Sequence, residues 1–181
     1  MLINQGGARS RSARASKWRR SVDRRCCRRR LSTMRDTGNA VSQENVELVR
    51  RLYAELASEG STQEFEQRMS DDALGRLLDP EIEWVPMTES LLAVDSYHGF
   101  DGVRRFWGEF LSAWERYRVE TLRFDDAGDQ VAVVVHIVGR THELEVDETR
   151  SSLLTVRDGR VVRVESFADP DGARQAAGLP P

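Results

Sequence analysis

The spacing of apolar residues changes from a helical period to a strand period near residue 116, and this change strongly constrains the fold. After it, side chains alternate with period two in four runs that end at Phe167, and Asp158-Gly159 is typical of a tight hairpin. Before it, an amphipathic helix is predicted by apolar residues that recur every three or four positions, at Val46, Val49, Leu52, Tyr53 and Leu56. Helical segments followed by consecutive antiparallel strands predict an α+β fold, with three helical segments packed on one face of a curved antiparallel sheet.

Three helices are expected in the first part of this domain. Ser42 is a suitable N-cap for the first helix, and Gly60 ends it. Thr62 caps a second helical stretch, which runs to Leu78. The third helix follows Asp101 and carries a broad apolar face.

Two strand patterns carry further information. Ile82 and Trp84 alternate with glutamates, so both are predicted to point inward from a short strand. The run from Val131 to Val138 is apolar on both faces except at His136. Such a strand needs cover on its second face, which predicts a homodimer formed through the sheet.

Charge divides the chain into an extension and a domain. Residues 1–40 hold 12 Lys and Arg against 2 Asp and Glu, whereas residues 41–181 hold 15 against 28. The extension lacks apolar periodicity, so we expect residues 1–40 to be disordered. We place the domain at 41–170 and a short tail at 171–181. The acidic domain argues against binding of nucleic acid, because phosphates would be repelled.

The basic composition of the extension has two interpretations. It superficially fits an organellar transit peptide or an RNA-binding tail. The chain also has 26 Arg and a single Lys, a bias expected from GC-rich coding DNA. We therefore favour Met34 as the true start, with the preceding residues translated from upstream DNA.

Cysteines and apolar runs bear on the cellular setting. Cys26 and Cys27 lie in the extension, and adjacent cysteines rarely bridge each other, so no disulfide framework is expected. A cytoplasmic location follows as an expectation. No apolar run is long enough for a membrane span, and no spacing suggests a metal or cofactor site, so neither a membrane nor a cofactor is expected.

The order of segments resembles the SnoaL-like branch of the NTF2-like superfamily, the nuclear transport factor 2 family. The resemblance rests on Ser42–Tyr53, Leu78–Trp84, Tyr97–Trp107 and Thr155–Glu165, and it covers most of the chain after residue 40. It implies a cone-shaped α+β domain whose helices and concave sheet face enclose an apolar pocket. Such folds host cyclases, isomerases, hydrolases and proteins without catalytic activity.

Two branches of the superfamily place carboxylates where this chain has none. The ketosteroid isomerase branch has its general base on the first short strand, where Ile82 and Trp84 take the inward positions, and a second acid near Ser151 to Leu153. The epoxide hydrolase branch has an acid on the last strand, where Ser166 falls, and Glu165 lies on the opposite face by alternation. Both activities are therefore disfavoured.

The polyketide cyclase branch uses a histidine and an aspartate in the pocket. His136 is the best candidate for this role, because burial between apolar neighbours would keep the imidazole neutral and usable as a base. Tyr53 occupies the position of a tyrosine that donates a hydrogen bond to a substrate oxyanion in the isomerase branch. A structural histidine and a core tyrosine are the alternatives for these two residues.

The remaining pocket candidates follow from the same resemblance. It implies that Tyr97 and His98 lie near the pocket rim, while Trp84 and Trp107 line either the pocket or the core. Ser166 is expected in the pocket as well. The sequence thus predicts binding of a small, largely apolar molecule, with or without cofactor-free acid–base chemistry of the cyclase, isomerase or hydrolase type. A non-catalytic ligand sensor or protein-interaction module is the alternative.

Overall fold

The computed structural model describes residues 24–57, 70–87, 96–141 and 144–180. Its helices are α1 (Arg24–Ala57), α3 (Asp71–Leu74), α4 (Gly99–Ser112) and α5 (Gly172–Ala176). Its strands are β1 (Leu78–Val85), β2 (Tyr97–His98), β3 (Arg116–Ala127), β4 (Gln130–Arg140), β5 (Glu145–Arg157) and β6 (Arg160–Phe167). No described helix is long and apolar enough to cross a membrane.

The strands form one curved sheet with the order β2-β1-β6-β5-β4-β3. The strands from β3 to β6 follow one another along the chain as hairpins. The pairs β3–β4, β4–β5 and β5–β6 are therefore antiparallel. β1 instead runs parallel to β6, because no hairpin links these two strands and their pairing is set by packing. The predicted α+β class and helix-covered curved sheet are confirmed, and the sheet is mixed rather than wholly antiparallel.

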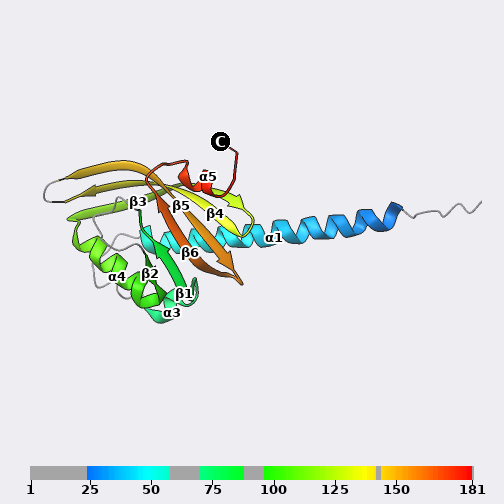
Figure 1. Ribbon diagram of the computed structural model, residues 1–181, viewed down its shortest axis with the longest axis horizontal. Coiled ribbons are helices and arrows are strands. Elements are labelled where there is room, and N and C mark those ends of the chain that lie inside the picture. The colour runs from blue at the N-terminus through cyan, green and yellow to red at the C-terminus, as the bar shows by residue number, and fades with distance from the viewer. Residues whose placement is uncertain (1–23, 58–69, 88–95, 142–143, 181) are drawn as a thin grey trace, which may run out of the picture.

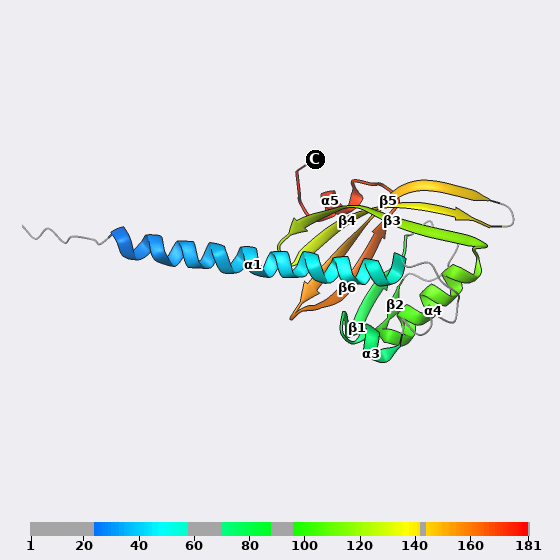
Figure 2. The same cartoon turned by 180° about the vertical axis from the view of Figure 1, so that it is seen from behind.

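Helices cover the two faces of the sheet unequally. α1 lies along one face and contacts β3 and β4, while α4 packs on β1 and β2 (Figure 1). The short α5 lies against the opposite face (Figure 2). We call the face under α1 and α4 the concave face and the face under α5 the convex face. Most buried apolar residues lie on the concave face, in one cluster with members from α1, α4 and the strands β1, β2, β4, β5 and β6, and partly buried residues of β3 pack against it.

The first helix begins earlier than the sequence predicts. Ser42 lies inside α1 rather than at its N-cap, and its hydroxyl donates a hydrogen bond to the Asp126 carboxylate. Asn45 Nδ2 donates to the Gly128 carbonyl at 2.9 Å. Both side chains are buried, and their hydrogen bonds connect α1 to the turn between β3 and β4. Neither side chain caps a helix.

Residues 24–40 are helical where disorder is predicted for residues 1–40, and α1 projects beyond the sheet (Figure 1). Arg, Leu and Met favour helices, so the packed segment of α1 can be continued toward its N-terminus. Residues 1–23 lie outside the described residues.

The second predicted helix is only partly described. Thr62 and its neighbours, residues 58–69, lie outside the described residues. α3 is a single turn, and Leu78 belongs to β1 instead of ending a helix, because it is fully buried in the sheet and pairs with Val161. The inward orientation predicted for Ile82 and Trp84 is confirmed, since both side chains are buried.

A bulge in β3 changes which side chains of that strand reach the core. The pairing with β4 shifts between Thr121 and Arg123, which leaves Leu122 opposite no partner and 54% exposed. The alternation therefore reverses after Leu122, and Phe124 packs against Tyr53 with ring centroids 6.2 Å apart. Bulges of this kind bend a strand and so help a sheet to curve around its core.

Candidate functional site

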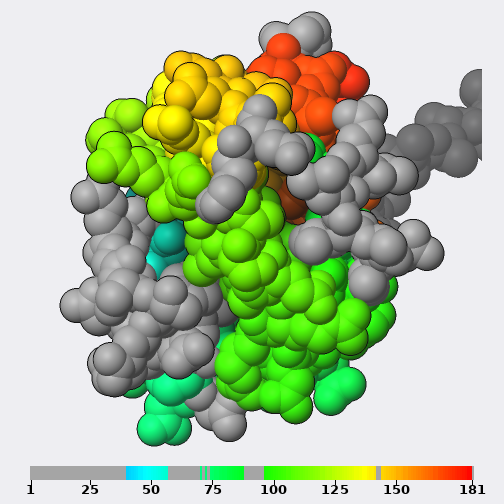
Figure 3. Space-filling view, turned by 90° about the vertical axis from the view of Figure 1, so that its left-hand side faces the viewer, coloured from blue at the N-terminus to red at the C-terminus, as the bar shows by residue number. Residues whose placement is uncertain are grey.

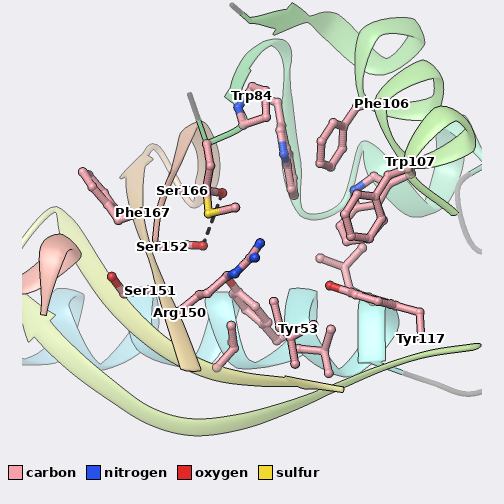
Figure 4. Close-up of a pocket in the computed structure, with 17 residues that line it drawn as sticks. Tyr53, Trp84, Phe106, Trp107, Tyr117, Arg150, Ser151, Ser152, Ser166 and Phe167 are labelled. Carbon is pink, nitrogen blue, oxygen red and sulfur yellow. Dashed lines mark hydrogen bonds between the residues drawn. The ribbon is translucent and has the colours of Figure 1, made fainter. Parts of the chain in front are cut away.

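A cavity of about 100 Å³ lies between α4, the end of α1 and the concave face of the sheet (Figure 4). Most of its wall is aromatic or aliphatic. The aromatic lining residues come from α1, β1, α4, β3 and β6; they are Tyr53, Trp84, Phe106, Trp107, Phe110, Tyr117 and Phe167. A concave apolar space with a few polar groups is the usual form of a small-molecule site.

Helix α4 supplies one wall through residues on a single helical face. Phe106 stacks on Phe110 with ring centroids 5.7 Å apart, as residues four apart on a helix are expected to meet. Trp84 of β1 lies 5.4 Å from the Phe106 ring and 5.7 Å from that of Trp107. These contacts hold the rings in fixed orientations around the cavity.

A glycine allows this aromatic wall to meet the far end of the sheet. A Cβ atom at Gly139 would lie 2.4 Å from the Trp114 ring, which is closer than any two such atoms can approach. Trp114 in turn contacts Phe110 and Tyr117, at 5.7 and 5.5 Å between ring centroids. Figure 3 looks onto this end of the molecule, where α4 lies below the tip of β4 and β5.

Arg150 is the one charged residue among the described residues that line the cavity. It lies in the middle of β5, and Figure 4 shows its guanidinium directed into the space between Ser152, Trp84 and Tyr117. The side chain is 24% exposed. Its Nε and Nη2 donate to one oxygen of Glu148 at 2.9 and 2.5 Å. No described residue accepts a hydrogen bond from Nη1.

Two tyrosines place phenolic hydroxyls in the same cavity. Burial raises the pKa of Tyr53 to about 12, against a smaller opposing effect of a hydrogen bond with Ser152. Burial also raises the pKa of Tyr117; the nearby Tyr53 adds to this shift and Arg150 opposes it. Both phenols are therefore neutral near pH 7 and can donate hydrogen bonds, but neither can act as a base there.

Further polar atoms come from β5, β6 and β1. Ser152 and Ser166 are paired across the sheet, with their hydroxyl oxygens 3.5 Å apart. Trp84 Nε1 is buried and has no hydrogen-bond partner among the described residues. A buried donor without a partner costs free energy, so a ligand oxygen near it would be favoured.

His136 does not lie in the cavity. Its neighbours Val135 and Ile137 line it, and alternation along β4 directs His136 to the convex face. There its Nε2 lies 2.7 Å from Asp147 Oδ1. The predicted role of His136 as the acid–base group in the pocket is not supported, because apolar neighbours along the chain do not show which face of a strand a residue occupies.

The predicted rim residues also lie away from the described cavity lining. Tyr97 is buried, packs on Phe106 and donates its hydroxyl to Glu109 Oε2 at 2.8 Å. His98 is exposed, and its Nε2 lies 3.0 Å from the Ser96 hydroxyl. Tyr97 therefore faces the core and His98 faces solvent. Their strand, β2, lies at the edge of the sheet beyond β1. Tyr53, Trp84, Trp107 and Ser166, by contrast, are all brought together around the cavity.

The described lining contains no carboxylate and no imidazole. Glu165 and Glu83 both bind Arg163 outside it. The described residues also contain no group of three or more potential metal ligands. The described part of the site thus offers hydrogen-bond donors and one positive charge, without a residue that removes a proton.

Sequence reasoning missed Arg150 and Tyr117. A signal for Arg150 was available, because it shares a face of β5 with Ser152, two residues on, and a charged residue facing a core is unusual. Its neighbours Glu148 and Thr149 are polar, however, and make the segment resemble a solvent-exposed strand end. Tyr117 is the second residue of β3, and its alternation with Val119 on one face of the strand was the available signal.

Comparison with known families gives the fold a name. A model of the SnoaL-like domain matches residues 49–164, which is more than half of the chain. The chain belongs to the SnoaL-like domain family. The matched residues fall inside the domain predicted at 41–170. A search of curated protein sequences found no match.

Solved structures support the same fold for this SnoaL-like protein. TerC, co-crystallised with polyporic acid, is 19% identical with a TM-score of 0.57, over 75% of this chain and 98% of TerC. A putative SnoaL-like polyketide cyclase from Jannaschia sp. CCS1 is 20% identical with a TM-score of 0.55, over 78% and 96%. An NTF2-like protein from Burkholderia xenovorans LB400 is 21% identical with a TM-score of 0.54, over 75% and 96%. At these identities the likeness concerns the fold alone.

Proposed function

We propose that this SnoaL-like protein binds a small, largely apolar, planar molecule in the cone cavity. One observation carries the proposal: an aromatic cavity of about 100 Å³ surrounds the guanidinium of Arg150. Flat rings stack well on such walls, and polar donors fix the orientation of a ligand. TerC, a neighbour in fold, was co-crystallised with polyporic acid, which agrees with a ligand-binding role for this fold.

Binding is favoured over proton-transfer catalysis. General base catalysis needs a group that accepts a proton near neutral pH within reach of the substrate. The described lining supplies two neutral tyrosines, hydroxyls and a guanidinium, none of which does so. We therefore propose the ligand-binding role, with the cyclase, isomerase and hydrolase types as the less supported alternative.

Aromatic probes of the size of one ring test the proposal. Benzoate and benzamide carry a single ring with one polar group, so they are among the smallest planar probes for a cavity of about 100 Å³. We expect saturable quenching of tryptophan fluorescence by both probes, because Trp84 and Trp107 line the cavity.

Val135→Phe provides the control, since Val135 lines the cavity and the larger ring would fill it. Circular dichroism checks that this variant folds, and both probes should then fail to bind. Equal binding to wild type and to the folded variant, or no binding to wild type, would overturn the proposal.

A homodimer formed through the sheet remains our proposal for the assembly, in a cytoplasmic setting and without nucleic acid as a partner. Val138 supports it, because this residue shares the convex face with His136 and is 43% exposed. Sedimentation equilibrium should give twice the chain mass for the wild type and a monomer for Val138→Arg. A monomeric wild type would contradict the dimer.

A further inference from the structure

We propose that the cavity selects ligands that carry an anionic oxygen, and that Arg150 is the residue that selects them. This inference rests on the proposed binding function and adds a chemical class: a planar ring system bearing a carboxylate, phenolate or enolate. The argument starts from the position of the charge. Arg150 lies in the middle of β5 with its guanidinium in a largely apolar cavity that no other described charged residue lines.

Moving a guanidinium from water into such a place costs free energy of desolvation, and the surrounding residues offset this cost only in part. Glu148 supplies a single accepting oxygen, Oε2, which binds Nε and Nη2. The Glu148 side chain is 52% exposed while that of Arg150 is 24% exposed, so the carboxylate lies on the solvent side of the pair. A guanidinium has five N–H donors, and this pairing leaves those of Nη1 available toward the cavity.

The wall around Arg150 strengthens an interaction with an anion. Aromatic side chains exclude water, and charge-assisted hydrogen bonds are stronger in a less polar environment. Trp84 lines the same wall, and its Nε1 is a buried donor without a described partner, so it adds no negative charge beside Arg150. The Tyr53 and Tyr117 phenols are neutral donors at pH 7, so they add no negative charge that would repel an anion.

Glu148 then acts as an internal competitor for the guanidinium. In the free protein it neutralises Arg150, and a ligand anion shares or displaces it. This arrangement favours anions over neutral isosteres without leaving an unpaired charge in the empty cavity, which would be costly.

Benzoate and benzamide test the inference, because they match in shape and differ in charge. We expect wild type to bind benzoate about tenfold more tightly than benzamide, as charged hydrogen bonds predict. Arg150→Gln should remove this preference, with benzamide affinity changed less than about threefold. Arg150→Lys should retain part of it, because the charge remains while the planar fork is lost.

Arg118→Gln is the matched control. Arg118 is an exposed arginine of β3 that does not line the cavity, so its variant should keep the tenfold preference. Equal affinities of wild type for the two probes, or an unchanged preference in Arg150→Gln, would overturn the selection of anions while leaving the binding function intact. Failure of both probes to bind wild type would overturn the binding function itself.

Discussion

His136 Nε2 lies 2.7 Å from Asp147 Oδ1 on the convex face of the sheet, away from the aromatic cavity. The two residues belong to the neighbouring strands β4 and β5, where His136 pairs with Thr149 and Asp147 pairs with Val138. The contact is solvent-accessible, since the side chains are 32% and 79% exposed. It joins a histidine to a carboxylate, but it does so where the described cavity cannot use them.

Replacement of His136 should therefore leave ligand binding unchanged. We expect His136→Gln to bind benzoate within about twofold of wild type, and an exposed pair contributes at most about 1 kcal/mol to the free energy of unfolding. Fluorescence titration measures the first quantity and urea unfolding the second. A loss of binding in this variant, with an unchanged fold, would place the site on the other face of the sheet.

Tyr53 predicts a loss of stability at alkaline pH. Its pKa is raised by burial from 10.0 to about 12, so the unfolded state loses this proton first as the pH rises. The free energy of unfolding is then fully retained below pH 10 and falls as the pH passes from 10 to about 12, by on the order of 2–3 kcal/mol for this group.

Tyr53→Phe should make that alkaline decline shallower, because the titrating hydroxyl is absent. Urea unfolding at a series of pH values between 8 and about 12 measures the decline. A decline of the same size in both proteins would show that other groups cause it.

Gly139 should tolerate no side chain. In Gly139→Ala the new methyl group meets the Trp114 ring, so the ring must move and we expect a loss of about 1–3 kcal/mol. Gly108→Ala is the control, because a Cβ atom in that position of α4 has no neighbour within 4 Å. Alanine favours helices, so this control should gain up to about 1 kcal/mol. Two variants of equal stability would contradict the close contact.

Ser151 should anchor α5 to the sheet. Its side chain is 1% exposed, donates to the Asp169 carbonyl at 2.6 Å and accepts from the Ala173 amide at 3.0 Å. Ser151→Ala leaves that amide without an acceptor and should cost about 1–3 kcal/mol in urea unfolding. Ser112→Ala removes an exposed hydroxyl and should change stability far less. A small effect at Ser151 would mean that water takes over its role.

Glu148 should weaken the binding of anions. If it competes for the guanidinium, Glu148→Gln raises benzoate affinity by a few-fold to about tenfold, while benzamide affinity changes little. Glu145→Gln is the control, because Glu145 contacts Arg140 at the strand end and does not line the cavity. Weaker benzoate binding in Glu148→Gln would instead indicate that Glu148 only holds Arg150 in place.

Much of the fold follows from local patterns in the sequence. The alternation after residue 116 fixes four strands, and tight turns connect the first pair at Gly128 and the last pair at Asp158-Gly159. These turns require positive φ, which the structure has at 82° for Gly128, 51° for Asp158 and 72° for Gly159. Such features depend on neighbouring residues alone, so a single sequence is enough to predict them.

The sequence leaves the orientation of β4 open. Val131 to Val138 is apolar on both faces, so no alternation of polar residues shows which side meets the core. The apolar run around His136 therefore predicts that its side chain is as buried as those of its neighbours. Its true side depends on long-range packing: α1 contacts one face of the strand, whereas α5 covers only part of the other.

The same division applies to the candidate site. The sequence determined the apolar faces of α1 and α4, the hairpins, and the inward Ile82 and Trp84, and the family resemblance implied the pocket positions of Tyr53 and Ser166. Tertiary structure alone decided that β1 lies parallel to β6, that a bulge turns Phe124 inward, and that Arg150 enters the cavity. The physical reason is that turns and periodicity arise from adjacent residues, whereas register and facing arise from contacts between segments far apart in the chain.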